Sequence, residues 1–273
     1  MSNNDHSTNC YTYKRWSQIR YPGESSLPEP VEPLAGTWPL YYLKRLPGGW
    51  FANCDGRSLN LEICRPTGID FDEELKAVEC ALHKLTDKRI QIAEYWGEGP
   101  PTKQWTPIID RLIDTYKLEA PRAGRVLAAV QAGINDAFVV CWHLKYLWDV
   151  ARPNQLNNDL HTVLPTPKHP TYPSGHATIS GTAEVILSYF FAPEAKRLKM
   201  FAEENALSRL YAGVHFPSDN FEGLQLGRQI GKIVVDKLKK QRNGEGVSVD
   251  KIIAHNYRAE LPPPPYKQVI PFP

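Results

Sequence analysis

The sequence predicts an all-α protein, a helical bundle preceded by an irregular N-terminal arm. Apolar residues recur at helical spacing over several long segments, and the alternation typical of strands is scarce. The first 69 residues are rich in Pro, Gly and aromatic residues and show no helical period. A chain of 273 residues that is 42% hydrophobic can bury a substantial core. We therefore divide it into an arm (1–69), a helical body (70–242) and a proline-rich tail (243–273).

The first half of the body predicts three helices. Asp70 is followed by Glu73 at the spacing of an N-terminal cap, and apolar residues then continue at helical spacing until Gly97. A second helical pattern covers residues 106–116. The third covers 121–150 and combines an apolar stripe with small residues that allow close helix contact. We expect this third helix to be central and buried.

The second half of the body predicts three further helices, at 177–191, 194–212 and 218–241. The last of them is opened by Pro217, a residue that suits the first turn of a helix. All six helices together form the predicted bundle.

The overall charge does not indicate a nucleic-acid or acidic-membrane partner. The 32 Lys and Arg residues nearly cancel the 30 Asp and Glu residues, so any preference for an anion must be local. The five cysteines are odd in number and have no CxxC spacing, which is typical of reduced thiols rather than of a disulfide framework or a zinc site. They are Cys10, Cys54, Cys64, Cys80 and Cys141.

The first ten residues, MSNNDHSTNC, are polar and lack the basic and then apolar layout of a signal peptide. A run of about 18 apolar residues, the length that spans a bilayer, is not apparent along the chain. We therefore expect a cytoplasmic protein without a membrane span.

The stretch PSGH, residues 173–176, lies just ahead of the helix expected at 177–191. A helix N-terminus presents unpaired backbone N–H groups and the positive end of the helix dipole, so it can bind an anion such as phosphate. Ser174 adds a hydroxyl, Gly175 a flexible backbone and His176 a titratable ring. The sequence therefore predicts an anion site here, provided that other segments supply positive charge.

Three cations are predicted to point towards the bundle interior. Lys145 lies beside the apolar stripe of the central helix, Arg152 follows seven residues later, and Arg209 falls on the inner face of its helix. His215 and Asp219 are spaced so that the carboxylate can accept a bond from one ring nitrogen and leave the other free. Each residue alone has an ordinary structural explanation. Burying three cations without an anion, however, costs on the order of several kcal/mol each, so together they predict one oxyanion site.

In chain order these residues form the pattern K-x6-RP, PSGH and SR-x5-H-x3-D, without a departure. This pattern resembles the signature shared by the type 2 phosphatidic acid phosphatases (PAP2), the bacterial class A acid phosphatases and the vanadium-dependent haloperoxidases. The match spans residues 145–219 and leaves the arm and the tail outside it. The resemblance implies an enzyme whose residues 70–242 form a catalytic domain of the PAP2/vanadium haloperoxidase type.

The same resemblance implies a role for each residue. His215 would be the group bonded to vanadium or phosphorus, Asp219 would orient it, and His176 would act as acid or base. Lys145 would also polarise bound peroxide. The oxygens of a vanadate or phosphate anion would be held by Lys145, Arg152, Ser174, Gly175 and Arg209.

The signature leaves two reactions open, because vanadate and phosphate have the same tetrahedral shape and charge pattern. In a haloperoxidase, vanadate on His215 serves the oxidation of a halide by hydrogen peroxide. In a soluble acid phosphatase, His215 attacks a phosphomonoester and forms a phosphohistidine. A third alternative is a non-catalytic phosphate- or vanadate-binding protein. The expected lack of spanning helices and of a signal peptide disfavours the phosphatase branches and favours the haloperoxidase.

Two further features favour a haloperoxidase-like enzyme. Residues 95–105, YWGEGPPTKQW, are similar to the W-x-D-G-P…W segment of bacterial haloperoxidase-like proteins, with Glu98 in place of Asp. His169 stands where bromoperoxidases of the family carry His and chloroperoxidases carry Phe. It would then line the halide side of the pocket and favour bromide or iodide over chloride, whereas the alternative is a loop histidine that faces water. The aromatic-rich arm suggests a homo-oligomer, but the natural substrate is not fixed by any of these residues.

Overall fold

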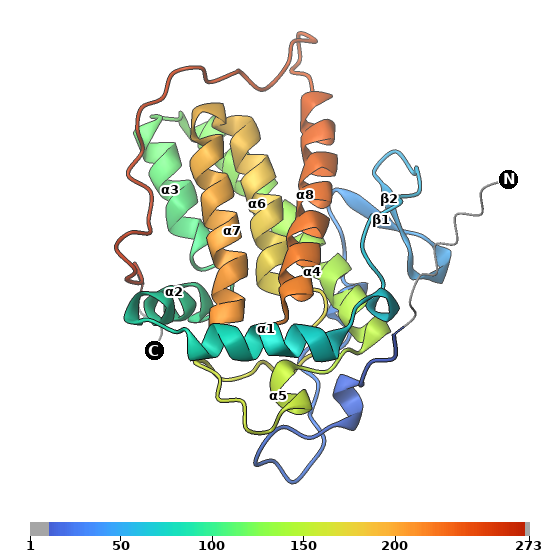
Figure 1. The fold of residues 1–273 in the computed structure, drawn as a ribbon. Helices are drawn as coiled ribbons and strands as arrows, with labels where there is room; N and C mark the ends of the chain where they lie inside the picture. Colours follow the sequence, from blue (N-terminus) through green and yellow to red (C-terminus); the bar gives the residue numbers. More distant parts are fainter. Residues whose placement is uncertain (1–10, 271–273) are drawn as a thin grey trace, which may run out of the picture.

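The computed structural model describes residues 11–270, and helices dominate it (Figure 1). The all-α prediction is confirmed, since the sheet within these residues consists of two short antiparallel strands, β1 (Leu43–Arg45) and β2 (Phe51–Asn53). The α-helices are α1 (Phe71–His83), α2 (Asp87–Gly97), α3 (Trp105–Thr115), α4 (Ala120–Trp148), α5 (Pro153–Leu156), α6 (Gly175–Phe190), α7 (Ala195–Tyr211) and α8 (Pro217–Lys239). Short 3-10 turns lie at η1 (Trp16–Gln18), η2 (Ala35–Thr37), η3 (Pro47–Gly49), η4 (Pro66–Gly68) and η5 (Ala192–Glu194).

The prediction of one continuous helix from Asp70 to Gly97 is wrong. Asp70 does cap α1 by accepting the backbone N–H of Glu73 at 3.0 Å, and α2 does end at Gly97. Between them the side chain of Thr86 caps a new helix. Its hydroxyl satisfies a backbone N–H that would otherwise be paired within a longer helix, so the chain turns there.

The central helix α4 ends slightly earlier than predicted, at Trp148. Asp149 follows in the left-handed conformation, with φ of 55°, and closes the last turn through its N–H to the carbonyl of Lys145. Arg152 therefore lies beyond the helix, at the start of the short helix α5, which the sequence pattern did not reveal.

Helix α6 forms the centre of the bundle and is packed against α4, α7 and α8 (Figure 1). Most of its residues are buried. Glycines bring α6 and α8 into backbone contact: a Cβ added at Gly223 would lie 2.7 Å from the carbonyl oxygen of Ser174, and one at Gly227 would overlap the carbonyl of Thr178. The first turns of these two helices, which carry the PSGH stretch and Asp219, are consequently held side by side.

The N-terminal arm packs along α4. The buried carboxylate of Asp136 accepts the backbone N–H groups of Tyr41, Tyr42 and Leu43 at 2.8, 2.7 and 2.9 Å. Gly36 lies so close to the backbone of His143 that an added Cβ would come within 2.6 Å of its nitrogen. Residues 11–69 are therefore fastened to the bundle, although their boundary with the body at residue 70 stays a prediction.

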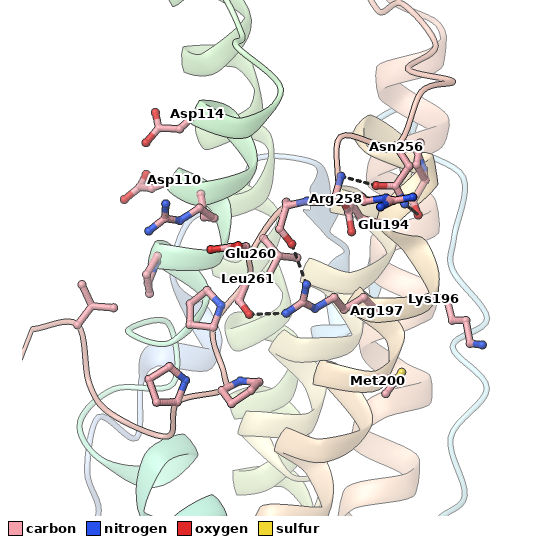
Figure 2. Close-up of a pocket in the computed structure, with 18 of the residues that line it drawn as sticks. Asp110, Asp114, Glu194, Lys196, Arg197, Met200, Asn256, Arg258, Glu260 and Leu261 are labelled. Atoms are coloured by element: carbon pink, nitrogen blue, oxygen red, sulfur yellow. Dashed lines mark hydrogen bonds between the residues drawn. The ribbon is translucent and has the colours of Figure 1, made fainter.

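The C-terminal tail leaves the end of α8, passes over the ends of the neighbouring helices and runs down beside α3 to α2 (Figure 1). Arg197 of α7 donates to the carbonyl oxygens of Ala259 and Leu261, both at 2.7 Å (Figure 2). Further along, Tyr266 donates to Glu204 at 2.7 Å. A cavity of 1140 Å³ lies beneath this tail, and its lining includes none of the residues that the sequence predicts for the anion site.

The expectation that no segment is apolar enough to cross a membrane is wrong for α4. Among the described residues, this helix reaches a mean hydropathy of 1.3 over 18 residues, and 56% of that window is buried inside the protein. The core helix of a bundle passes the same test, so length and hydropathy alone are weak evidence.

The cysteines within residues 11–270 are free in the structure, namely Cys54, Cys64, Cys80 and Cys141. Cys10 lies outside the described residues.

Candidate active site

A pocket of 730 Å³ opens where α6 begins, and five of the predicted residues line it. They are His169, Gly175, His176, Arg209 and His215. The other four, Lys145, Arg152, Ser174 and Asp219, are fully buried directly behind this wall. The structure thus gathers three segments of the sequence around one cavity.

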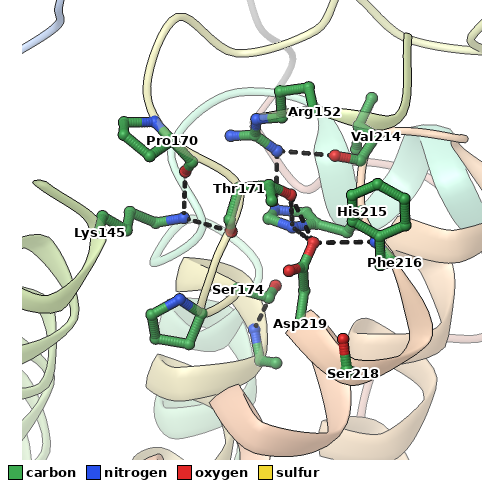
Figure 3. Close-up of polar contacts among 12 residues, drawn as sticks. Lys145, Arg152, Pro170, Thr171, Ser174, Val214, His215, Phe216, Ser218 and Asp219 are labelled. Atoms are coloured by element: carbon green, nitrogen blue, oxygen red, sulfur yellow. Dashed lines mark hydrogen bonds and ion pairs between the residues drawn. The ribbon is translucent and has the colours of Figure 1, made fainter. Parts of the chain in front are cut away.

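His215 is oriented by hydrogen bonds at both ring nitrogens (Figure 3). Its Nδ1 lies 2.8 Å from Asp219 Oδ2, and its Nε2 lies 3.1 Å from Nη1 of Arg152. A guanidinium group can only donate, so Nε2 must be the unprotonated nitrogen and Nδ1 must carry the hydrogen. The ring therefore keeps the lone pair of Nε2 on the side opposite Asp219, as a nucleophile or a metal ligand requires.

Arg152 connects His215 with His169. Its Nη1 also donates to the carbonyl oxygen of Val214 at 2.7 Å, its Nε to that of His169 at 3.0 Å, and its Nη2 lies 3.0 Å from His169 Nδ1. The guanidinium is fully buried, so these contacts fix its orientation.

Lys145 and Arg209 are likewise held by backbone carbonyls. Lys145 Nζ donates to Pro170 and Thr171 at 2.8 and 2.7 Å, and Arg209 Nη2 donates to Ala93 at 2.8 Å. Gly97 allows the approach of Arg209, because a Cβ there would lie 2.6 and 2.7 Å from its terminal nitrogens.

Across residues 11–270, none of the cations Lys145, Arg152 and Arg209 forms an ion pair with a carboxylate. Asp219 is the nearby acidic group, and its Oδ2 is occupied by neutral donors and His215. Buried charge of one sign is costly unless an ion of opposite charge binds. The donor set therefore fits a tetrahedral oxyanion such as vanadate or phosphate.

Burial is the main cause of the shifted pKa values in the site, and for the histidines the neighbouring cations add to it. Burial, together with Arg209 and Arg152, holds the pKa of His176 well below its ordinary value, and burial with Arg152 does the same for His215. Burial also lowers the pKa of Lys145 to about 7 and that of Arg209 to about 9. Burial raises the pKa of Asp219, against the effect of its hydrogen bonds. A bound anion would favour the protonated form of each of these bases.

The PSGH stretch lies at the helix start, as predicted, but α6 begins at Gly175 rather than at residue 177. Gly175 and His176 are thereby in the first turn. The hydroxyl oxygen of Ser174 accepts the backbone N–H of Ala177 at 3.4 Å and caps the helix. Nε2 of His176 is buried in the pocket wall without a hydrogen-bond partner in the described part of the chain, so it is free for a ligand.

His169 is half-buried in the pocket wall and does not simply face water. Its ring lies against Trp142 with centroids 4.7 Å apart, and burial beside Lys145 and Arg152 lowers its pKa well below the ordinary value. Its role towards a halide stays a prediction, as do the individual roles of the other site residues.

Sequence reasoning missed several residues of the site. Thr171 contacts both His215 and Asp219, and Phe138 and Trp142 of α4 form an aromatic wall. Glu94 and Glu98 line the same pocket from the end of α2. Glu98 belongs to the segment that is similar to haloperoxidase-like proteins, whereas the other four residues carry no local signal in the sequence.

Comparison with known proteins agrees with the geometry. The model of the family described as the PAP2 superfamily matches residues 125–242, which include every motif residue of the site. A crystal structure of a bacterial vanadium-dependent iodoperoxidase superimposes with a TM-score of 0.66 and 25% identity, covering 83% of this chain. Residues 125–242 match the PAP2 superfamily, and the fold is similar to that of a vanadium-dependent haloperoxidase. Members of this superfamily are haloperoxidases or phosphatases, and both are enzymes.

Relatives of both kinds are found. A vanadium-dependent bromoperoxidase of Corallina pilulifera is 33% identical over 92 residues, which cover 24% of this chain and 15% of the relative. Decaprenylphosphoryl-5-phosphoribose phosphatase of Mycobacterium tuberculosis is 31% identical over 114 residues, which cover 42% of this chain and 62% of the relative. The matched part is 62% of the iodoperoxidase chain. This chain therefore spans less than two thirds of each of these relatives.

Proposed function

We propose that the chain is a vanadium-dependent haloperoxidase that oxidises bromide or iodide, rather than chloride, with hydrogen peroxide. The observation that carries the proposal is the set of three buried cations without ion pairs around His215, whose Nε2 keeps its lone pair. The similarity to the iodoperoxidase structure over most of the chain favours this chemistry over phosphate hydrolysis.

The residues fit vanadate in the following way. Lys145, Arg152, Arg209 and the first-turn amide of Gly175 would hold its oxygens, and Nε2 of His215 would bind the metal. Bound vanadate supplies the activation of hydrogen peroxide towards a halide.

Asp219 keeps the hydrogen on Nδ1 of His215, so the lone pair stays on Nε2, and a bound anion would take the place of the bond from Arg152. The overall reaction, H2O2 + Br⁻ + H⁺ → HOBr + H2O, consumes one proton. His176 is suited to deliver it, because its unpartnered Nε2 lies in the pocket wall. The aromatic wall of Phe138 and Trp142 gives one side of the cavity an apolar surface.

The second candidate is an acid phosphatase that uses the same residues. The match to the mycobacterial phosphatase supports it, and an unprotonated Nε2 on His215 suits a nucleophile that attacks phosphorus. In that reaction the three cations stabilise the transition-state charge and His176 protonates the leaving alcohol.

A paired assay on one purified sample tests the proposal. Bromination of a phenolic dye is measured with vanadate, bromide and peroxide, and hydrolysis of an aryl phosphate is measured without vanadate. We expect vanadate-dependent bromination with little hydrolysis. Hydrolysis that vanadate inhibits, without bromination, would assign the site to the phosphatase reaction, and silence in both assays would favour an anion-binding protein.

Histidine variants assign the roles within the site. His215→Ala should abolish turnover and weaken vanadate binding, whereas His176→Ala should lose turnover and still bind vanadate. The exposed His83 on α1 provides a matched control, since His83→Ala should change neither. Normal turnover of the His215 variant would remove that residue from its proposed role.

The halide preference is tested by His169→Phe. If His169 lines the halide side, the ratio of bromide to chloride oxidation should fall in this variant. An unchanged ratio would remove it from halide selection. The cytoplasmic location and self-association through the arm stay predictions.

A further inference from the structure

We propose that Thr171 is a positioning residue that locks the carboxylate of Asp219 and thereby fixes the hydrogen of His215 on Nδ1. The inference rests on the proposed anion chemistry at His215. It adds a third member to the His215–Asp219 pair, from a loop that lies outside the three motifs of the signature.

The hydroxyl of Thr171 lies between the two partners (Figure 3). It donates a short hydrogen bond to Asp219 Oδ2, and its oxygen lies 3.1 Å from Nδ1 of His215. A threonine hydroxyl has a single hydrogen, which is used in the bond to Asp219. Towards Nδ1 it can therefore only accept, and this contact is favourable only when Nδ1 carries the hydrogen. The side chain thus selects the same tautomer as Arg152 does from the other side of the ring.

The carboxylate of Asp219 depends on this contact for its orientation. Its Oδ2 receives the hydroxyl of Thr171, the N–H of Phe216 at 2.8 Å and Nδ1 of His215. Its buried Oδ1 has no hydrogen-bond partner within the described residues. Three hydrogen bonds now oppose rotation of the carboxylate. Without the hydroxyl of Thr171 only two would remain, so Oδ2 would be held less firmly next to His215.

Thr171 also links His215 to Lys145. Its carbonyl oxygen accepts from Lys145 Nζ at 2.7 Å, and its own N–H donates to the carbonyl of Val150 at 3.0 Å. The backbone is therefore fixed independently of the side chain. Removal of the hydroxyl should change the His215–Asp219 pair while the Lys145 contact remains.

A role in packing alone makes a different prediction. Valine has the shape of threonine without the hydroxyl, and serine retains the hydroxyl without the methyl group. Because Thr171 is fully buried, packing favours Thr171→Val over Thr171→Ser. If the hydroxyl positions Asp219, Thr171→Ser should instead keep the tautomer and the anion affinity better than Thr171→Val does.

The test combines ¹⁵N NMR of the histidine rings with calorimetric binding of vanadate and of inorganic phosphate. The ring signals of His215 are assigned by their loss in His215→Ala. In the unmodified chain and in Thr171→Ser we expect the Nδ1–H tautomer. In Thr171→Val we expect tautomer exchange and about a tenfold loss of anion affinity, the equivalent of one lost charge-assisted hydrogen bond.

Thr182 provides the matched control. It is also fully buried, but its hydroxyl bonds only to the carbonyl oxygens of Thr178 and Gly227, so Thr182→Val should leave the tautomer and the affinity unchanged. If Thr171→Val does not fold, Thr171→Ala removes the hydroxyl together with the methyl group, and Thr171→Ser shows the effect of the missing methyl group alone.

The proposal is overturned if the hydroxyl-free variant keeps the tautomer and affinity of the unmodified chain, or if Thr171→Ser loses as much as Thr171→Val. The tautomer is measured without vanadate. It therefore remains informative even if the unmodified chain shows no bromination, the outcome that would overturn the proposed function instead.

Discussion

Gly97 is the position at which a single methyl group should most directly disturb the anion site. A Cβ there would lie 2.6 Å from Nη2 and 2.7 Å from Nη1 of Arg209, and it would also overlap the side chain of Leu164. The guanidinium would have to move away from α2, which breaks its 2.8 Å bond to the carbonyl of Ala93. Overpacking of this kind costs about 1–3 kcal/mol of stability.

The displaced Arg209 should also bind an oxyanion less well. One charge-assisted hydrogen bond contributes about 1.5–3 kcal/mol, so Gly97→Ala should weaken vanadate and phosphate binding by roughly 10- to 150-fold. Calorimetric titration measures the affinity, and urea unfolding measures the stability. Gly124→Ala on α4 is the control, since no atom lies within 4 Å of its added Cβ, and it should gain up to about 1 kcal/mol without affecting affinity. Binding by Gly97→Ala as tight as that of the unmodified chain would refute this reasoning.

Three further predictions concern the arm, the tail and the pH dependence. Asp136→Asn should lower the free energy of unfolding by about 2–4 kcal/mol in urea titration, because its buried carboxylate accepts three backbone N–H groups of the arm; an unchanged midpoint would contradict this. Tyr266→Phe should cost about 1 kcal/mol and speed proteolysis of the tail, since it loses the bond to Glu204; equal cleavage rates would count against it. Burial lowers the pKa of His176 in the folded chain. Below about pH 6.5 the unfolded chain therefore binds a proton that the folded chain does not, and the free energy of unfolding decreases as the pH is lowered. His176→Ala should therefore lose less stability than the unmodified chain between about pH 6.5 and 5 in phosphate-free urea titrations, by up to about 1.4 kcal/mol per pH unit, and parallel profiles would argue against a depressed pKa.

The bundle could be predicted from the sequence because its signals are local. Helical periodicity correctly placed Arg209 on the inner face of α7, and the cap at Asp70 correctly marked the start of α1. The same periodicity continues across residues 84–86, so it concealed the break between α1 and α2. The apolar spacing alone favours one continuous helix, whereas the hydroxyl of Thr86 can cap a new one. The spacing does not show which of the two structures forms.

The parts of the site that escaped prediction depend on contacts between distant segments. Thr171 has no partner near it in sequence, and its bond to Asp219 exists only because α6 and α8 start side by side. Gly97 was correctly predicted to end a helix. Its closeness to Arg209 depends on how α2 packs against α7, which no local pattern records.

The backbone contact between α6 and α8 bears on how this enzyme could be re-engineered. The two helices carry opposite sides of the anion site, and at Gly227 their main chains leave no space for a Cβ, so neither can slide to accommodate a larger substrate. Adaptation can come from the cavity walls, which include the loop residues 98–101 and 164–167 and the α4 side chains Phe138 and Trp142. A directed-evolution library confined to these two loops would sample new substrates while the floor that performs the chemistry stays intact, whereas a library spread over α6 and α8 would consist mainly of unfolded chains.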